Sequence, residues 1–161
     1  GLFLPKTIRE NITQVILPKL FPRGIVQRQR EVSLTSEQIR ALRIMTTSGE
    51  KPVIELSGGN QQKVVVAKWL LTDSDLIIFD EPTRGIDVGA KAEIYGIIND
   101  LANQGKAVLI ISSDMPELIG LSDRIYTMKD GEITGELTRD PEKGFAQEEI
   151  MRLIIEGREA T

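Results

Sequence analysis

The stretch that decides the fold of this chain is Leu76-Ile77-Ile78-Phe79-Asp80-Glu81-Pro82. Its four apolar residues predict a buried strand, which Pro82 ends. The carboxyl ends of parallel strands form the edge of a sheet where ligands bind, so Asp80 and Glu81 are expected at such an edge. There Asp80 can hold a magnesium ion through water, while Glu81 can orient a water that attacks a phosphoryl group. Taken alone, Asp-Glu-Pro is equally consistent with a strand that ends in solvent.

The residues around this strand alternate between helical and extended patterns. We expect helices over residues 60–71 and 88–103, with a second strand over residues 108–111. Gly105 predicts the end of the second helix. Strands that alternate with helices are typical of parallel βαβ units, so the sequence predicts an α/β fold.

The last third of the chain carries signals for a hairpin and two helices. Asp114, with a glutamate three residues later, predicts a helix start. Asp130-Gly131 separates the apolar runs 124–128 and 132–137, and Asp-Gly favours a tight hairpin turn. Residues 147–155 have the apolar spacing of an amphipathic helix.

The first 47 residues read as a small helical region. Pro5, Pro18 and Pro22 interrupt short helical segments. Residues 35–38 resemble a capping box, which predicts a helix that starts at Thr35.

Composition restricts the chemistry. The 161 residues carry a net charge of −4, which gives no electrostatic basis for binding nucleic acid or anionic lipid. The sequence contains no cysteine and no histidine. Catalysis must therefore come from carboxylates, hydroxyls, backbone amides and a bound cation. The apolar runs are too short to span a bilayer.

A second motif, Ser57-Gly58-Gly59-Asn60, stands just before the first predicted helix. Ser57 can cap the helix, and the glycines let backbone amides approach an anion. An isolated Ser-Gly-Gly is more simply explained as a glycine turn with a serine cap. The spacing changes this interpretation, because Asp80 lies 24 residues beyond Leu56 with one helix between them.

Four motifs in order carry a family resemblance. Leu56–Asn60 resembles the signature motif of ABC ATPases, Leu76–Glu81 their Walker B strand, and Arg84–Asp87 their D-loop. Ser113 stands where their switch histidine usually stands. More narrowly, the motifs are similar to those of the second ATPase cassette in bacterial monosaccharide importers of the ribose and galactose type.

The resemblance implies a fold and a set of roles. Residues 1–55 would form part of the helical subdomain, and residues 56–161 the signature helix and the C-terminal half of a P-loop NTPase core. Asp80 would bind Mg²⁺ through water, and the catalytic groups would be Glu81 and Ser113. The residues that contact ATP held by the opposite cassette would be Ser57, Gly58, Gly59 and Asn60, with Asp87 joining the two sites.

The resemblance also implies partners and a location. The whole protein would bind ATP and couple its hydrolysis to sugar uptake. Its partners would be a second ATPase cassette, membrane-spanning permease subunits and, indirectly, a periplasmic sugar-binding protein, with no nucleic acid. It would lie on the cytoplasmic face of the inner membrane, or in the cytoplasm if isolated.

Three departures from the family pattern matter. The phosphate-binding pattern Gly-x-x-x-x-Gly-Lys-Ser/Thr is absent, so we interpret the chain as a fragment and expect it to be inactive by itself. Such a fragment should expose an apolar sheet face. Ser113 cannot supply the charge of a histidine. Asn60 replaces the more widespread glutamine, as in the sugar-importer class.

Two other functions remain open from the sequence. One is a soluble ABC-type ATPase that acts on nucleic acid or ribosomes, which the acidic composition disfavours. The other is a regulatory cassette that binds ATP without hydrolysing it, which Ser113 favours and Glu81 opposes. Three more positions receive structural interpretations: Trp69 is expected in the core, and Lys63 and Lys68 on a solvated helix face.

Overall fold

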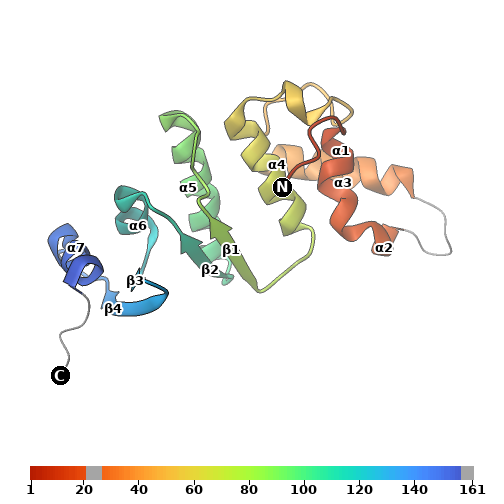
Figure 1. Cartoon of the computed structure of the whole chain (residues 1–161). Coiled ribbons are helices and arrows are strands. Elements are labelled where there is room, and N and C mark those ends of the chain that lie inside the picture. The colour runs from red at the N-terminus through yellow and green to blue at the C-terminus, as the bar shows by residue number, and fades with distance from the viewer. Residues whose placement is uncertain (21–26, 157–161) are drawn as a thin grey trace. The chain divides into compact units, whose positions relative to one another are not determined.

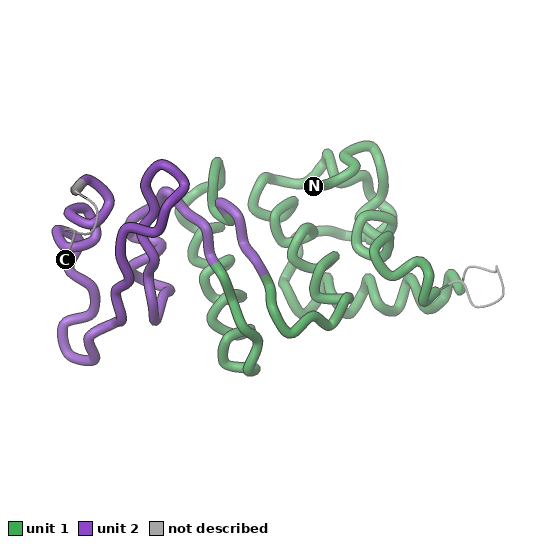
Figure 2. Tube along the Cα trace, turned by 60° about the horizontal axis from the view of Figure 1, so that its bottom comes forward, with its two compact units in different colours: residues 1–77, 82–109 green, residues 78–81, 110–161 purple. Residues whose placement is uncertain are grey.

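The computed structural model describes residues 1–20 and 27–156, and its chain is traced in Figure 1. Pro22 lies outside the described residues. The chain divides into two compact units, coloured green and purple in Figure 2. Unit 1 comprises Gly1–Ile77 and Pro82–Leu109, and unit 2 comprises Ile78–Glu81 and Ile110–Thr161. The fold is α/β.

Short helices form the first part of unit 1. They are α1 (Ile8–Thr13), η1 (Gln14–Ile16), α2 (Leu17–Leu20), α3 (Arg28–Ala41) and η3 (Val53–Glu55). A capping box starts α1, because Glu10 N–H donates to Thr7 Oγ1 and Thr7 N–H donates to the Glu10 carboxylate. Ile8 and Ile12, one helical turn apart, are fully buried and form the centre of this small core.

The predicted helix start at Thr35 is wrong. Thr35 lies in the middle of α3, where its hydroxyl donates to the Glu31 carbonyl one turn earlier. A threonine inside a helix satisfies its hydroxyl in this way without ending the helix. The chain enters α3 at Arg28 without a side-chain cap.

A charged cluster ties the ends of this region together. The Arg9 guanidinium contacts Glu31 at 2.9 Å and Glu50 at 2.8 Å, and Thr13 Oγ1 donates to Glu31 at 2.9 Å. Glu31 is only 5% exposed, and these donors compensate the free-energy cost of burying its charge. The hydrogen bond to Arg9 lowers the pKa of Glu50.

The βαβ arrangement is confirmed. The elements follow one another as α4 (Gly58–Leu70), β1 (Leu76–Asp80), α5 (Val88–Asn103) and β2 (Ala107–Ile111). The two strands pair in one sheet, with Ala107 N–H donating to the Asp75 carbonyl and Glu81 N–H donating to the Ile111 carbonyl. Gly105, with a φ of 84°, follows α5 as expected of a residue that ends a helix.

The expectation of a buried strand holds for only one face of β1. Phe79 is 7% exposed, whereas Leu76 and Ile78 are 53% and 56% exposed. Leu109 and Ile111 of β2 are also about half exposed. Alternate residues of a strand share a face, and nothing in the described parts of the chain covers this one. The expected exposed apolar face is therefore present.

Unit 2 is built around a hairpin. Strands β3 (Arg124–Lys129) and β4 (Glu132–Thr138) pair antiparallel through Asp130 and Gly131, both with positive φ, as the Asp-Gly signal predicted. Helix α7 (Gln147–Glu156) packs on this hairpin and buries Ile150. Helix α6 (Met115–Leu121) starts at Asp114, whose side chain accepts from Glu117 N–H. No helix in the described ranges combines the length and apolarity needed to cross a membrane.

Candidate functional site

The signature segment lies at the N-terminus of α4, a helix of 13 residues. Ser57 occupies the cap position with extended backbone, but its hydroxyl makes no capping hydrogen bond, so the cap expected from the sequence is not formed. Ser57 and Gly58 are exposed. Within residues 1–20 and 27–156, the N–H groups of Gly58, Gly59 and Asn60 donate to no side chain, so the positive end of the helix dipole has no protein acceptor there.

The Ser57 hydroxyl forms a hydrogen bond with the Asn60 side chain. Asn60 Nδ2 donates to Ser57 Oγ at 2.9 Å, and Asn60 Oδ1 accepts from Met45 N–H at 2.7 Å. The side chain of Asn60 thus connects the start of α4 to the turn that follows α3. This contact joins two of the residues predicted for the site, Ser57 and Asn60.

The two glycines of the motif have different surroundings. A Cβ at Gly59 would lie 2.5 Å from Ala90 Cβ of α5, a distance that real Cβ atoms essentially never show. A Cβ at Gly58 would meet Ile86 at 3.6 Å, an ordinary contact. Gly59 is therefore required by close packing of α4 on α5. Among the described residues nothing imposes such a requirement on Gly58, which is exposed.

The turn that precedes α5 lies beside the start of α4, because a Cβ added at Gly58 would lie 3.6 Å from Ile86. Gly85 has a φ of 76°, a backbone conformation that glycine adopts readily. Asp87 caps α5, because its carboxylate accepts from Ala90 N–H at 3.0 Å. The structure thus brings the predicted residues Gly58, Gly59 and Asp87 into one neighbourhood.

The acidic pair belongs to unit 2. Asp80 is the last residue of β1 and is exposed, while Glu81 is half-buried. Glu81 Oε1 accepts from Ser113 N–H at 3.0 Å, and Glu81 N–H donates to the Ile111 carbonyl. The structure therefore brings Glu81 and Ser113 into contact, and Asp80 directly precedes Glu81 at the end of β1. Glu81 has a φ of 48°, an uncommon conformation for a residue with a side chain and one that often marks functional sites.

The described ranges 1–20 and 27–156 contain no group of three acidic, histidine or cysteine side chains that could hold a metal ion by themselves. Mg²⁺ keeps several waters and is bound through one or two carboxylates together with substrate phosphates. A single exposed carboxylate such as Asp80 fits this mode of binding.

The interpretations of three α4 residues from the sequence are wrong. Lys63 and Lys68 are 1% and 7% exposed, while Trp69 is 49% exposed. Lys63 Nζ donates to the Arg43 carbonyl at 3.0 Å and lies 2.8 Å from Glu93 of α5. Burial lowers the pKa of Lys68, whose Nζ donates to the Gly1 carbonyl. The helical spacing of Gly59, Lys63 and Ala67 was a signal that Lys63 belongs to the buried stripe.

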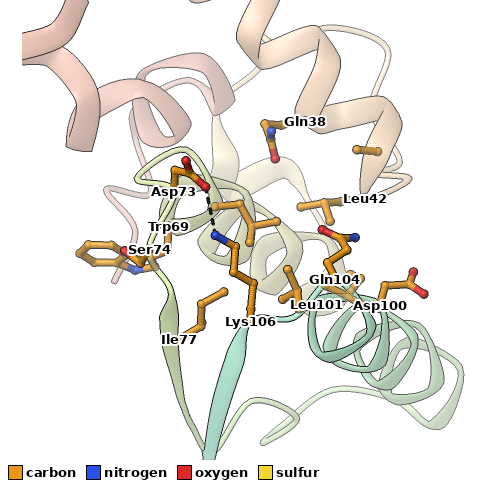
Figure 3. Close-up of a pocket in the computed structure, with 13 residues that line it drawn as sticks. Gln38, Leu42, Trp69, Asp73, Ser74, Ile77, Asp100, Leu101, Gln104 and Lys106 are labelled. Atoms are coloured by element: carbon orange, nitrogen blue, oxygen red, sulfur yellow. Dashed lines mark hydrogen bonds and ion pairs between the residues drawn. The ribbon is translucent and has the colours of Figure 1, made fainter.

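A cavity of about 310 Å³ lies in unit 1 between the ends of α3, α4 and α5 (Figure 3). Its lining includes the carboxylates of Asp73 and Asp100. Lys106 reaches into the same region and pairs with Asp73 at 3.1 Å. The lysine charge is already compensated there, so the cavity offers a poor environment for phosphate. It is distinct from the residues predicted for the site.

Sequence comparisons place this geometry in a family. A model described as "ABC transporter" matches residues 1–84. The L-arabinose transport ATP-binding protein AraG of Geobacillus stearothermophilus is 50% identical over 155 residues, which cover 96% of this chain and 29% of AraG. The ribose import ATP-binding protein RbsA of Oceanobacillus iheyensis is 49% identical over 157 residues, which cover 98% of this chain and 31% of RbsA. The chain thus spans less than a third of either relative's length.

Solved structures agree on the fold. A dimeric, post-hydrolysis structure of the ATP-binding cassette MJ0796, bound to ADP and Pi, superposes with a TM-score of 0.72 and 24% identity, over 86% of this chain and 59% of that one. The ADP conformation of MJ1267, an ATP-binding cassette of an ABC transporter, superposes with a TM-score of 0.68 and 23% identity. The match covers 93% of this chain and 59% of that one. These likenesses show the cassette fold. Since the family model also matches more than half of its residues, this chain belongs to the ABC transporter family.

Proposed function

We propose that these residues work within the ATP-binding subunit of a monosaccharide importer, which couples ATP binding and hydrolysis to sugar uptake. Relatives that are 45% to 50% identical are named for ribose import or L-arabinose transport. The observation that carries the proposal is the open start of α4, where donors of the signature segment face outward. A helix N-terminus with unpaired N–H groups is well suited to receive a phosphate.

The signature segment would contact ATP held by the opposite cassette. Ser57 would offer its hydroxyl, and the segment from Gly58 to Asn60 its backbone amides. Asp87 caps α5, the helix that packs against the start of α4, and it therefore lies beside this segment. There it would join the two nucleotide sites across the interface. The partner that completes this site would be a second cassette, in the same chain or in a dimer mate.

The end of β1 would serve the other nucleotide. Asp80 would hold Mg²⁺ through water, and the cation would neutralise charge on the phosphate oxygens. Glu81 would polarise the attacking water with the oxygen that Ser113 N–H does not engage. Ser113 would act mainly by holding this carboxylate through its backbone, since a hydroxyl lacks the charge of a histidine.

The remaining assignments concern the whole protein. Residues 1–55 would form the helical subdomain that contacts membrane-spanning permease subunits, and residues 56–161 the signature helix and part of the nucleotide-binding core. A periplasmic sugar-binding protein would deliver the substrate to the permease, and the cassettes would lie on the cytoplasmic face of the membrane. The 161 residues contain no phosphate loop, so we expect the isolated chain to be inactive.

The substitution Glu81→Gln in the whole protein tests the proposal. Glutamine keeps an acceptor for Ser113 N–H but cannot take a proton, so ATP hydrolysis should fall by about a hundredfold or more while ATP still binds. Steady-state phosphate release measures the first quantity and nucleotide titration the second. Unchanged hydrolysis would exclude a catalytic role for Glu81 and would favour a regulatory cassette.

A further inference from the structure

The Asn60 side chain is held between two partners that fix its orientation. Its Oδ1 accepts from Met45 N–H at 2.7 Å, and its Nδ2 donates to Ser57 Oγ at 2.9 Å. A backbone N–H can only donate, so the amide oxygen must face Met45. The amide NH₂ group must then face Ser57. The reversed amide would bring two donors together at 2.7 Å.

This orientation determines what the Ser57 hydroxyl can do. An amide NH₂ donates and does not accept, so Ser57 Oγ receives a hydrogen bond from Asn60. The single proton of the hydroxyl is left for another acceptor. Ser57 is exposed and makes no capping bond to α4, so this proton is available toward solvent. The uncapped N–H groups of the first turn of α4 stand at the same place.

We propose that Asn60 is a positioning residue that makes the Ser57 hydroxyl a hydrogen-bond donor toward a phosphate oxygen. The inference rests on the proposed function, in which Ser57 contacts ATP. The Asn60 side chain acts on the nucleotide only through Ser57. An acceptor in place of the amide NH₂ would draw the hydroxyl proton inward and present lone pairs to the phosphate instead.

The turn that supplies the Met45 N–H is itself anchored by α4. Arg43 has a φ of 50°, and its carbonyl accepts from Lys63 Nζ at 3.0 Å. Lys63 is 1% exposed and pairs with Glu93 of α5. Asn60 and Lys63 are three residues apart on α4, and both therefore form hydrogen bonds to the turn that follows α3. This double attachment keeps the Met45 N–H directed at Asn60.

The isosteric substitution Asn60→Asp tests the inference in the whole ATP-binding subunit. A carboxylate still accepts from Met45 N–H but now also accepts from the Ser57 hydroxyl. The loss of one hydrogen bond to a charged phosphate should lower kcat/KM for ATP by about tenfold or more. Asn60→Gln retains an amide NH₂ group that can donate to Ser57 Oγ, so it should lower kcat/KM less than Asn60→Asp does. Thermal denaturation of each variant verifies folding.

Two controls separate hydroxyl orientation from charge. Gln62→Glu adds the same charge two positions further along α4 without facing Ser57, and it should reduce kcat/KM only slightly. The second control repeats Asn60→Asp in a Ser57→Ala background. Because Asn60 acts through Ser57, the loss caused by Asn60→Asp should shrink there to the size of the Gln62→Glu effect.

The outcomes distinguish the inference from the proposed function. If Asn60→Asp lowers kcat/KM equally with and without the Ser57 hydroxyl, or if Asn60→Gln falls as far as Asn60→Asp, the inference is wrong. If Ser57→Ala alone leaves kcat/KM unchanged, Ser57 does not contact the nucleotide and the proposed role of the signature segment fails instead.

Discussion

The start of α4 and the end of β1 both present polar groups to solvent, but they are supported differently. The start of α4 is held by the packing of Gly59 on Ala90 and by the hydrogen bond between Asn60 and Met45 N–H. Backbone pairing holds the second, with one carboxylate contact from Glu81 to Ser113. Substitutions at the α4 start should therefore alter both stability and function, whereas those at the β1 end should alter function alone.

The largest effect on stability is expected for Gly59→Ala. The new Cβ would lie 2.5 Å from Ala90 Cβ, so α4 and α5 must move apart, which should destabilise unit 1 by about 2 kcal/mol. Gly58→Ala is the matched control and should change the free energy of unfolding by less than about 1 kcal/mol. Urea denaturation measures both.

A compensating change sharpens this prediction. Ala90→Gly removes the clashing methyl group and should restore much of the stability lost in Gly59→Ala, although glycine in a helix itself costs about 1 kcal/mol. If Gly59→Ala proves as stable as Gly58→Ala, close packing does not fix the start of α4.

The next effect compares two buried lysines. Lys63→Met leaves the Arg43 carbonyl without its donor and Glu93 without its partner, and it should destabilise the chain by about 1–2 kcal/mol. Lys68→Met removes a donor to the carbonyl of Gly1, an exposed residue that water can solvate, and an ammonium group whose pKa burial lowers, so it should be nearly neutral or stabilising. Equal losses for both variants in urea denaturation would contradict this distinction.

A smaller effect concerns Asp87, which has a structural role in this chain and a proposed role across the cassette interface. Asp87→Ala removes the cap of α5 and should cost about 1 kcal/mol, while Asp87→Asn keeps an acceptor for Ala90 N–H and should cost much less. Thermal denaturation tests the cap. If Asp87→Asn is stable but slows ATP hydrolysis in the whole protein, the second role is supported. Unchanged hydrolysis would leave Asp87 as a helix cap alone.

The smallest effect is a pH dependence at residues that belong to neither site. Hydrogen bonding to Arg9 lowers the pKa of Glu50 below its ordinary value of 4.5. The stabilisation is therefore present above that value and is lost as pH falls through the folded-state pKa. Urea denaturation at neutral pH and near pH 4 should show a loss that Glu50→Gln reduces. An identical pH dependence in the variant would exclude this pair as a cause.

The sequence predicted the elements whose signals are local. The run ending at Asp80 identified β1, Gly105 the end of α5, and Asp130-Gly131 the hairpin. Each depends on neighbouring residues only, such as strand alternation or the conformational freedom of glycine. The same reasoning placed Asp80 and Glu81 at the end of β1. The hydrogen bond from Ser113 N–H to Glu81 was not predicted.

Features that depend on tertiary contacts were missed. Lys63 was interpreted as a surface lysine because its partners are distant in sequence: the Arg43 carbonyl lies 20 residues earlier and Glu93 lies on the next helix. The orientation of Asn60 depends on Met45, 15 residues away in sequence. Thr35 looked like a helix start because the same residue type satisfies its hydroxyl either at a cap or inside a helix.

The most direct test of the account is a calorimetric titration of this chain with ATP and Mg²⁺. The account holds that the α4 start contacts a nucleotide whose phosphates are held mainly by another loop, since no phosphate-binding loop is present in the 161 residues. We therefore predict no measurable binding below about 1 mM ATP, a limit near −4 kcal/mol of binding free energy. Tight, one-to-one binding would contradict the account, because these residues would then contain a complete phosphate site.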